Sequence, residues 1–234
     1  MKYRNTDPET MDDPQLPEPV LRKVLMDITR VNRLLNGNRI TLRAILRLVR
    51  ENPQREYTIV DMGCGDGYML RAVADLFRIK GIPVRLMGID LSAKGIALAR
   101  KASLSYPEIE YMVRNILTIA PGELKCDILL CTLTMHHFSD SEIPVFMERF
   151  IQLSTIGVVV NDLQRSWTAY YLFKFFSLIF IKTDIGRSDG LISIKSGFLK
   201  KELQAFSELF PTVHHTIRYK WAFRYLWLIR IKFP

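Results

Sequence analysis

Apolar and polar positions alternate along the middle of the chain in two distinct rhythms. Short apolar runs typical of buried strands lie at 57–61, 84–89, 109–114, 126–131 and 156–161, and helical spacing of apolar residues lies between them at 67–80, 93–104 and 140–153. The run at 126–131 is largely apolar, as expected for a parallel strand that is covered on both faces. Strands that alternate with helices in this way predict an α/β fold with a doubly wound parallel sheet and right-handed crossovers.

The segments before this series have a different character. The first dozen residues are polar and proline-rich, and we expect them to form a mobile arm. Amphipathic helices are predicted at about 20–35 and at about 39–50. Residues 1–54 are therefore expected to form an arm and helices that precede the main domain, residues 55–234.

The segment after the last strand of the series is unusually aromatic. Residues 163–182 are too apolar all round for an ordinary surface helix, which predicts a cap over the site, a partner interface or a membrane-touching face, with plain core packing as the alternative. Because it contains Gly186 and Gly190, the stretch 184–195 is expected to be a loop, so that the cap insertion spans about 163–195. The rest is expected to be a helix capped by Ser196 that runs to about Leu209, then strands at 212–219 and 222–231.

Charge and cysteine content narrow the function classes only partly. The 234 residues have a formal net charge of +9, which suits RNA, an anionic membrane surface, an acidic substrate or simply a solvated basic face. The three cysteines show no metal-ligand spacing, and we expect no metal site. An odd cysteine count without an apolar leader favours a cytoplasmic location, and no apolar run reaches the ~18 to 20 residues that a membrane span needs.

A tight glycine turn joins the first predicted strand to the first helix of the series. The run from Asp61 to Gly67 reads Asp-Met-Gly-Cys-Gly-Asp-Gly. Glycines allow positive φ and close approach of a ligand, and the start of a helix offers free N–H groups to an anion. A dinucleotide fingerprint would need glycine where Tyr68 stands, and no Gly-Lys-Ser/Thr follows for a phosphate-binding P-loop. The turn therefore predicts a different nucleotide-like ligand.

Two acids indicate which ligand this is. Asp61 stands just before the first glycine, where it suits an ammonium group better than a pyrophosphate. Asp90 ends the second strand, where a carboxylate can accept hydrogen bonds from ribose hydroxyls. S-adenosylmethionine (SAM) has an amine, a carboxylate and an adenosine ribose, and it fits this set.

The run 61–67, followed by Gly-Ile-Asp-Leu-Ser at 88–92 and the helix 93–101, resembles class I SAM-dependent methyltransferases over about residues 55–165. The resemblance implies a doubly wound, mostly parallel, seven-stranded Rossmann-like sheet with an antiparallel C-terminal hairpin, N-terminal helices and a helical cap. It also implies SAM as the cofactor. The residues expected to bind SAM are Asp61, Gly63, Cys64, Gly65, Gly67, Asp90, Leu91, Asn115, Ile116 and Thr132. This family usually has an acid after the third strand for the adenine amino group, and here Asn115 can accept that bond.

Two histidines follow the fourth strand, at the place where the resemblance puts the sulfonium. Methyl transfer from a sulfonium needs an in-line nucleophile, close approach and, for some acceptors, a base. An imidazole with an ordinary pKa of ~6.5 can take a proton from a phenol or a carboxylic hydroxyl. His136 and His137 are therefore the candidate catalytic residues. Structural or cofactor-shielding histidines are the alternative.

The fifth strand ends in Asn-Asp-Leu-Gln-Arg at 161–165, which resembles the Asn-Asp-Leu-His-Arg segment of small-molecule methyltransferases associated with type III polyketide and phenolic-lipid pathways. Residues 11–14, 30–35 and 188–194 are similar to the same subgroup. The residues expected to contact the substrate are Asp162, Arg165, Tyr170 and Tyr171. An ion pair that fixes the cap is the alternative for Asp162 and Arg165.

We expect O-methylation of a small aromatic or lipophilic acceptor, with C-methylation left open. The chain has no Asn/Asp-Pro-Pro-Tyr-like segment after the fourth strand, which disfavours methylation of DNA bases or glutamine. RNA methylation is a second hypothesis, based on the charge and on Trp221, Tyr225 and Trp227 in a basic hairpin. A SAM-fold binding subunit without activity is the third. Contact with a membrane surface and the oligomeric state are left open.

Overall fold

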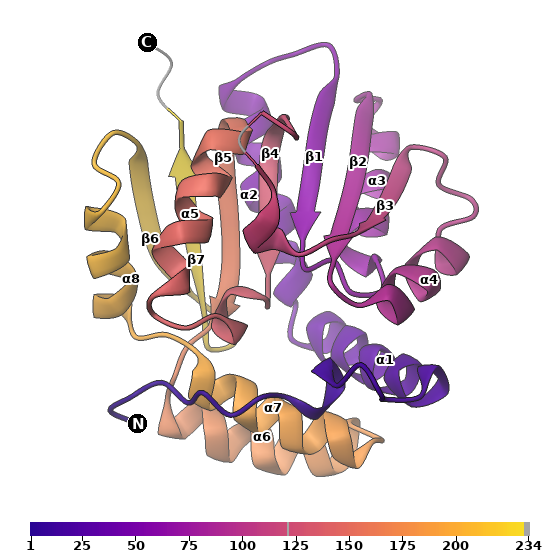
Figure 1. Cartoon of the computed structure of the whole chain (residues 1–234), viewed down its shortest axis with the longest axis vertical. Helices are drawn as coiled ribbons and strands as arrows, with labels where there is room; N and C mark the ends of the chain where they lie inside the picture. The colour runs from indigo at the N-terminus through magenta and orange to yellow at the C-terminus, as the bar shows by residue number, and fades with distance from the viewer. Residues whose placement is uncertain (121, 232–234) are drawn as a thin grey trace.

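One seven-stranded sheet organises the part of the chain that the computed structural model describes, residues 1–120 and 122–231 (Figure 1). The strands are β1 (Tyr57–Met62), β2 (Val84–Asp90), β3 (Ile109–Val113), β4 (Cys126–Thr132), β5 (Ser154–Leu163), β6 (His214–Lys220) and β7 (Arg224–Arg230). Their order is β3-β2-β1-β4-β5-β7-β6. The first five strands pair in parallel, and β7 is antiparallel to both β5 and β6. The predicted fold class is confirmed.

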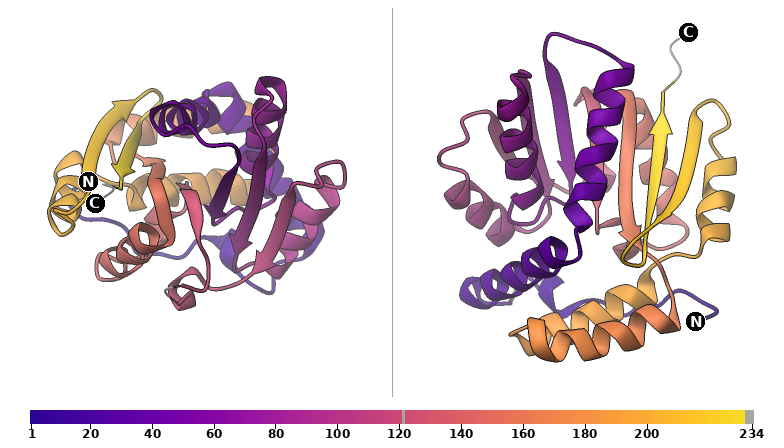
Figure 2. Two further views of the ribbon diagram at one scale, coloured as in Figure 1. Left: turned by 90° about the horizontal axis from the view of Figure 1, so that it is seen from above. Right: turned by 180° about the vertical axis from the view of Figure 1, so that it is seen from behind.

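Helices cover both faces of the sheet (Figure 2). One face packs on α2 (Gly37–Glu51), α3 (Tyr68–Lys80) and α4 (Ala93–Ala102), and the other packs on α5 (Glu142–Leu153) and α8 (Lys200–Glu208). Two apolar clusters result, one on each side of the strands. Because α2 contributes Ala44, Ile45 and Leu48 to the first cluster, the N-terminal region shares the core of the main domain.

Three more helices gather at the carboxyl ends of the parallel strands. They are α1 (Glu18–Leu34), α6 (Trp167–Phe180) and α7 (Asp184–Ser196), and Figure 1 shows them below the sheet. Three short 3-10 helices complete the described part of the chain: η1 (Thr10–Asp12), η2 (Ile116–Thr118) and η3 (Met135–His137). In open α/β sheets ligands bind at these strand ends, where the strand order reverses. Here that point lies between β1 and β4.

The prediction of a loop at 184–195 is wrong, because this stretch forms α7. Its two glycines allow close packing and do not break the helix. A Cβ on Gly190 would lie 2.3 Å from the ring of Phe173, and one on Gly186 would lie 2.8 Å from Oγ1 of Thr183. Thr183 also caps the helix, because its Oγ1 accepts a hydrogen bond from the Gly186 N–H at 3.0 Å.

The predicted capping role of Ser196 is also wrong. Ser196 is the last residue of α7, and the next helix, α8, starts four residues later with Leu199 at its N-cap. Glu202 accepts the hydrogen bond of the Leu199 N–H at 2.8 Å, which satisfies a free donor at the helix start. The helix therefore begins at a point where a glutamate side chain accepts the N-cap hydrogen bond, and no serine cap is used.

The N-terminal arm is packed along α7, although its composition suggested an unattached segment (Figure 1). The Arg4 guanidinium donates hydrogen bonds to the carbonyl groups of His136, Phe138 and Ser196 at 2.9–3.0 Å. Asp189 on α7 accepts hydrogen bonds from the Thr10 and Met11 N–H groups at 3.1 and 2.8 Å. Contacts between residues so far apart in sequence leave no periodic signal in the arm.

The aromatic helix α6 has apolar side chains on two sides. One side faces the interior of the helical layer through Ala169 and Phe173. Large exposed side chains on the other side include Trp167, Tyr171, Phe175, Leu178 and Ile179. Among the described residues, the structure has no helix with the length and apolar character needed to cross a bilayer.

Candidate active site

The glycine turn after β1 combines tight packing with one open position. Gly63, Gly65 and Gly67 all have positive φ, at 78°, 54° and 74°. A Cβ on Gly63 would lie 2.3 Å from the side chain of Thr134, and one on Gly67 would lie 2.1 Å from the hydroxyl of Tyr111, so both glycines make room for the protein's own side chains. At Gly65 the nearest side-chain atom would be 3.6 Å away. A ligand can therefore approach the backbone most closely at Gly65.

Asp61 is a buried carboxylate without a counter-charge at the end of β1. The residue is only 2% exposed, and among the described residues none forms a hydrogen bond with its Oδ1. Burial and the nearby charge of Asp90 raise its pKa from 3.8 to about 8. A buried carboxyl with an unpaired oxygen is costly unless a ligand completes it. The ammonium group of SAM would do so.

Asp90, at the end of β2, shapes the turn that faces Asp61. Its Oδ2 accepts a hydrogen bond from the Gly65 N–H and its Oδ1 one from the Ser92 N–H, each at 2.8 Å. Burial raises its pKa. Each carboxylate oxygen retains a second lone pair, which a ribose hydroxyl can use. At neutral pH a cationic ligand is needed to hold Asp61 in its charged form, and SAM, with its sulfonium and ammonium groups, meets that need.

The remaining residues expected to bind the cofactor surround this turn less directly. Leu91 is 71% exposed next to Asp90, as an adenine-facing side chain requires. Asn115 caps η2, because its Oδ1 accepts a hydrogen bond from the Leu117 N–H at 2.9 Å. One of its lone pairs is therefore already used, which weakens its predicted bond to the adenine amino group. Ile116 beside it is buried.

Cys64 and Thr132 lie in the body of the fold. Cys64 is buried, its thiol has a pKa raised by burial, and a Cβ on Gly88 would lie 2.8 Å from its Sγ. Thr132 ends β4, where its Oγ1 lies 3.3 Å from Oγ1 of Thr41. Both contacts hold elements of the site together, and the structure shows no cofactor-facing role for either side chain.

The two histidines follow β4 in η3, and Asp162 on β5 orients the first of them. Oδ1 of Asp162 lies 2.7 Å from Nδ1 of His136, and its Oδ2 accepts the His136 backbone N–H at 3.1 Å. Both side chains are buried. The ring is therefore fixed with its Nε2 pointing away from β5, as a carboxylate–histidine pair requires for catalysis.

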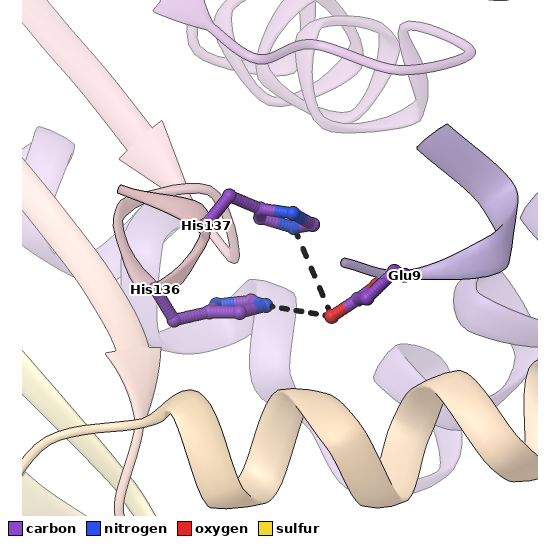
Figure 3. A group of neighbouring side chains, drawn as sticks. All are labelled: Glu9, His136 and His137. Atoms are coloured by element: carbon purple, nitrogen blue, oxygen red, sulfur yellow. Dashed lines mark ion pairs between the residues drawn. The ribbon is translucent and has the colours of Figure 1, made fainter. Parts of the chain in front are cut away.

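Glu9, on the N-terminal arm, completes this group (Figure 3). Its Oε1 lies 3.3 Å from Nε2 of His136 and 4.0 Å from Nε2 of His137, and it accepts a 2.5 Å hydrogen bond from the Ser193 hydroxyl. Burial alone would raise the pKa of Glu9, but the two histidines outweigh it and hold that pKa below 4.5. The sequence offered no signal for Glu9, since it lies far from the histidines in an aperiodic arm.

The charges around His136 change the predicted state of its ring. Burial alone would lower its pKa, but Asp162 and Glu9 outweigh burial and raise it to about 10. With Glu9 and Asp162 ionised, His136 is an imidazolium at neutral pH in the ligand-free chain. The expected neutral base is therefore not its resting form, and the proton-accepting unit is the coupled group of Glu9 and His136.

A chamber of about 450 Å³ lies beside these residues, between α1, α6, α7 and the β6–β7 turn. Its lining is mainly apolar and includes Val24, Ile28, Leu133, Ala169, Phe173 and Phe176. Glu9, His136 and His137 form part of its wall. Thr134, in the same segment as these histidines, donates a 3.3 Å hydrogen bond to the Gly63 carbonyl. One short segment after β4 therefore joins the chamber to the glycine turn.

Arg224 is a charged group in the chamber wall that the sequence did not single out. It is 3% exposed, and its Nε and Nη1 have no hydrogen-bond partner. Its Nη2 donates a 2.5 Å hydrogen bond to Oδ1 of Asn32. Burial lowers its pKa to about 10. A buried guanidinium with two free nitrogens favours an anionic or hydrogen-bond-accepting group nearby.

The residues expected to contact substrate lie outside the chamber. Asp162 stands behind His136, and Arg165 forms an ion pair with Glu202 at 2.5 Å and donates to the Gly197 carbonyl at 2.6 Å. The ion pair foreseen as the alternative for Asp162 and Arg165 is not formed between them, because Arg165 pairs with Glu202 on α8 and Asp162 with His136. Tyr170 and Tyr171 are on α6 but do not line the chamber. Arg165 and the two tyrosines are therefore not assigned a contact with the substrate.

The C-terminal hairpin does not present the aromatic platform that the RNA hypothesis needed. Trp227 and Tyr225 are buried, and Trp227 donates a 3.1 Å hydrogen bond to His215. Arg230 forms an ion pair with Glu51 at 2.8 Å. Trp221 remains exposed, at the rim of the chamber. Two of the three aromatic residues on which the RNA hypothesis rested are therefore buried and cannot stack on bases.

Comparison with known proteins agrees with this geometry. Residues 59–155 match the family model described as a methyltransferase domain. The matched segment contains the glycine turn, Asp90 and both histidines. Among curated proteins, none matches the chain.

Solved structures of methyltransferases are similar in fold. The plantazolicin methyltransferase BamL, in complex with a triazolic desmethylPZN analog and SAH, is 16% identical with a TM-score of 0.68, over 92% of this chain and 92% of that chain. Magnesium protoporphyrin IX methyltransferase (ChlM) from Synechocystis PCC 6803 with bound SAH is 13% identical with a TM-score of 0.57, over 84% of each chain. The CMeT domain of the citrinin polyketide synthase is 16% identical with a TM-score of 0.55, over 75% of this chain and 46% of that one.

Proposed function

We propose that this chain, whose residues 59–155 match a methyltransferase domain, is a SAM-dependent methyltransferase that methylates a small aromatic or lipophilic acceptor, with a hydroxyl group as the favoured nucleophile. The observation that supports this most strongly is the apolar chamber beside His136. A volume of about 450 Å³ falls within the range of small-molecule pockets. The polar groups are few and are grouped at defined places in the wall, as orientation of one small acceptor requires.

The glycine turn and the two acids suit the cofactor. Asp61 would receive the ammonium group of SAM, Asp90 the ribose hydroxyls, and the open position at Gly65 the close approach of the ligand. When bound, SAM supplies a methyl group on a sulfonium. Bound SAM would stabilise the ionised form of Asp61, which the ligand-free chain keeps protonated at neutral pH, and an anionic ligand would not.

The group of Glu9, His136 and Asp162 would handle the proton of the acceptor. Asp162 fixes the His136 ring, and Glu9 is the ionised oxygen base in the chamber wall. An acceptor hydroxyl next to Glu9 would lose its proton to this group while its oxygen stays close to the imidazolium, which stabilises developing negative charge. Such positioned acid–base groups typically contribute ~10²- to 10⁴-fold in rate.

Arg224 supports a finer statement about the acceptor. Its two unpaired nitrogens in an apolar wall favour an acceptor that also has a carboxylate or another strong hydrogen-bond acceptor. The resemblance of residues 161–165 to enzymes of phenolic-lipid pathways supports a phenol as the nucleophile. The solved structures of similar fold include a plantazolicin methyltransferase, a magnesium protoporphyrin IX methyltransferase and a domain of the citrinin polyketide synthase, which is consistent with a small-molecule acceptor. Three buried free cysteines suit a reducing compartment such as the cytoplasm.

The test is methyl transfer from labelled SAM to a panel of acceptors. The panel contains alkylphenols, hydroxybenzoic acids with alkyl chains, their methyl esters, and total RNA. We expect label in the phenols, with the free acids preferred over the esters by the parent and not by Arg224→Gln. Label in RNA alone, or no label in any acceptor despite bound SAM, would overturn the proposal.

A further inference from the structure

Three ligand atoms from distant parts of the chain converge in the chamber wall (Figure 3). They are Oε1 of Glu9 and the Nε2 atoms of His136 and His137, and they all lie within 4.8 Å of one another. Glu9 comes from the arm, and the histidines come from η3. Two imidazoles and one carboxylate are a donor set that divalent transition metals prefer, whereas Mg²⁺ prefers oxygen ligands alone.

A second carboxylate stands behind each histidine. Nδ1 of His136 lies 2.7 Å from Asp162, and Nδ1 of His137 lies 2.9 Å from Oδ2 of Asp12. In each ring an acid thus holds Nδ1, and Nε2 is turned toward Glu9. This carboxylate–histidine arrangement is the one that orients histidine ligands of metal ions and fixes their tautomer.

The distances fit metal ligands better than a direct hydrogen bond. Charge-assisted N–H···O bonds are about 2.7–2.9 Å long, but Oε1 of Glu9 is 3.3 Å from His136 and 4.0 Å from His137. Ligand atoms at ~2.0–2.1 Å from a tetrahedral zinc ion are ~3.3–3.4 Å apart. The first pair already has this separation, and the second needs a small rotation of the partly exposed His137 ring.

An unpaired buried nitrogen points to a missing ligand. Nε2 of His136 is buried, and no group in the described part of the chain forms a hydrogen bond with it, although the ring is almost fully enclosed. Glu9 is in turn held in place by the 2.5 Å hydrogen bond from Ser193. Glu9 and His136 are therefore held in place before any ion arrives, and the unpaired nitrogen of His136 faces Glu9.

We propose that Glu9, His136 and His137 bind one divalent transition-metal ion of the zinc class, with a remaining coordination position open to the chamber. Three protein ligands with one open position are the pattern of catalytic zinc sites. The inference rests on the proposed function for its role: the ion would lower the pKa of an acceptor hydroxyl as a Lewis acid. With the ion bound, Glu9 and His136 are its ligands, and the ion replaces them in promoting loss of the acceptor proton. The O–H bond breaks and its proton passes to solvent, the O–CH₃ bond forms as the S–CH₃ bond breaks, and the products are a methyl ether and S-adenosylhomocysteine.

The experiment titrates the chelator-treated full-length chain with Zn²⁺ by calorimetry, with Mg²⁺ as the contrasting ion and Co²⁺ as an optical probe. We expect about one Zn²⁺ per chain, no competing uptake of Mg²⁺, and visible Co²⁺ bands that Zn²⁺ abolishes. Glu9→Gln and His137→Ala should each weaken Zn²⁺ binding by about 100-fold or more, and Asp12→Asn by ~10- to 100-fold. His214→Ala is the matched control, because His214 is an exposed histidine outside the site and its loss should leave binding unchanged.

The outcomes distinguish a failure of the metal site from a failure of the proposed methyl transfer. Asp12 is on the surface, so a loss of Zn²⁺ affinity in Asp12→Asn with an unchanged thermal unfolding curve supports the site even if a buried variant misfolds. Absence of stoichiometric Zn²⁺ binding by the parent overturns the metal site, as does an equal loss in His214→Ala. Methyl transfer that persists in the metal-free parent would overturn the Lewis-acid role and leave the proposed function intact.

Discussion

Oδ1 of Asp162 lies 2.7 Å from Nδ1 of His136, and Oδ2 of the same carboxylate accepts the His136 backbone N–H at 3.1 Å. One acid on β5 therefore fixes both the ring and the backbone of a residue that follows β4. The pairing depends on the parallel register of these two strands, in which Thr132 lies opposite Asn161. It explains why the conspicuous Asn-Asp-Leu-Gln-Arg segment serves the site from behind the histidine.

The first prediction concerns this pair. Asp162→Asn removes the charge that orients the His136 ring, so kcat for methyl transfer should fall ~10²-fold or more. Cofactor affinity should stay within about twofold of the parent, because Asp162 lies away from the glycine turn. Steady-state kinetics and calorimetry with S-adenosylhomocysteine measure both. Asp184→Asn changes an acid with a 97% exposed side chain and serves as the control, and an equal loss there would contradict the argument.

A second prediction follows from the pKa of Asp61, which rises from 3.8 to about 8 in the folded chain. Between these values the folded chain binds the proton that the unfolded chain has released. The free energy of unfolding should therefore fall as the pH rises through this window. Asp61→Asn removes this contribution, so the ligand-free variant should lose less stability between about pH 5 and about pH 9 than the parent.

Denaturant unfolding of both proteins at several pH values measures this difference. The variant should be the more stable protein at the alkaline end, because the parent must bury an unpaired carboxylate there. Parallel pH profiles for parent and variant would show that Asp61 has an ordinary pKa. The unpaired environment described for it would then be wrong.

The sequence predicted the sheet and α1 well and missed α7, for physical reasons. Buried strands and the helices between them have periods that follow from burial on each face, so their positions were predicted within a few residues. At Gly186 and Gly190 the local signal suggests a loop, but a neighbouring helix occupies the space of the missing side chains. Long-range packing of this kind is invisible in a local pattern.

Some residues of the candidate site could likewise be predicted from the sequence, and others could not. Asp61, Asp90 and the glycine turn follow one another along a short sequence with a recognisable spacing, and the structure brings them together. Glu9 and Arg224 could not be predicted, because each reaches the chamber from an end of the chain through contacts that span most of its length. Tyr170 and Tyr171 were favoured by their place in an aromatic run, and only the orientation of α6 shows that they do not line the chamber.

A third prediction tests how tightly α6 and α7 pack. In Gly190→Ala the new Cβ would lie 2.3 Å from the ring of Phe173, so the helices must separate. We expect a loss of about 1–3 kcal/mol in the free energy of unfolding. Gly95→Ala is the control, since the nearest atom to a Cβ at that helical glycine would be 3.3 Å away. Similar stability of both variants would show that the layer can relax.

A fourth prediction tests the chamber as the acceptor site. Ala169 is buried in its wall, and Ala169→Trp would fill part of the space of about 450 Å³. KM for a bulky acceptor should rise by about tenfold or more, since a lost or blocked apolar contact is worth ~1–3 kcal/mol, while cofactor binding stays unchanged. Tyr171→Ala alters the outer side of α6 and should change neither. Acceptor kinetics that respond to Tyr171 but not to Ala169 would place the acceptor elsewhere.

The most direct measurement is calorimetric titration of the purified chain with SAM and with S-adenosylhomocysteine, for the parent, Asp61→Asn and the exposed Asp75→Asn on α3. The account predicts saturable binding to the parent and to Asp75→Asn, and binding at least about tenfold weaker for Asp61→Asn, because a buried charge pair is lost. No binding by the parent, or equal binding by all three proteins, would contradict it.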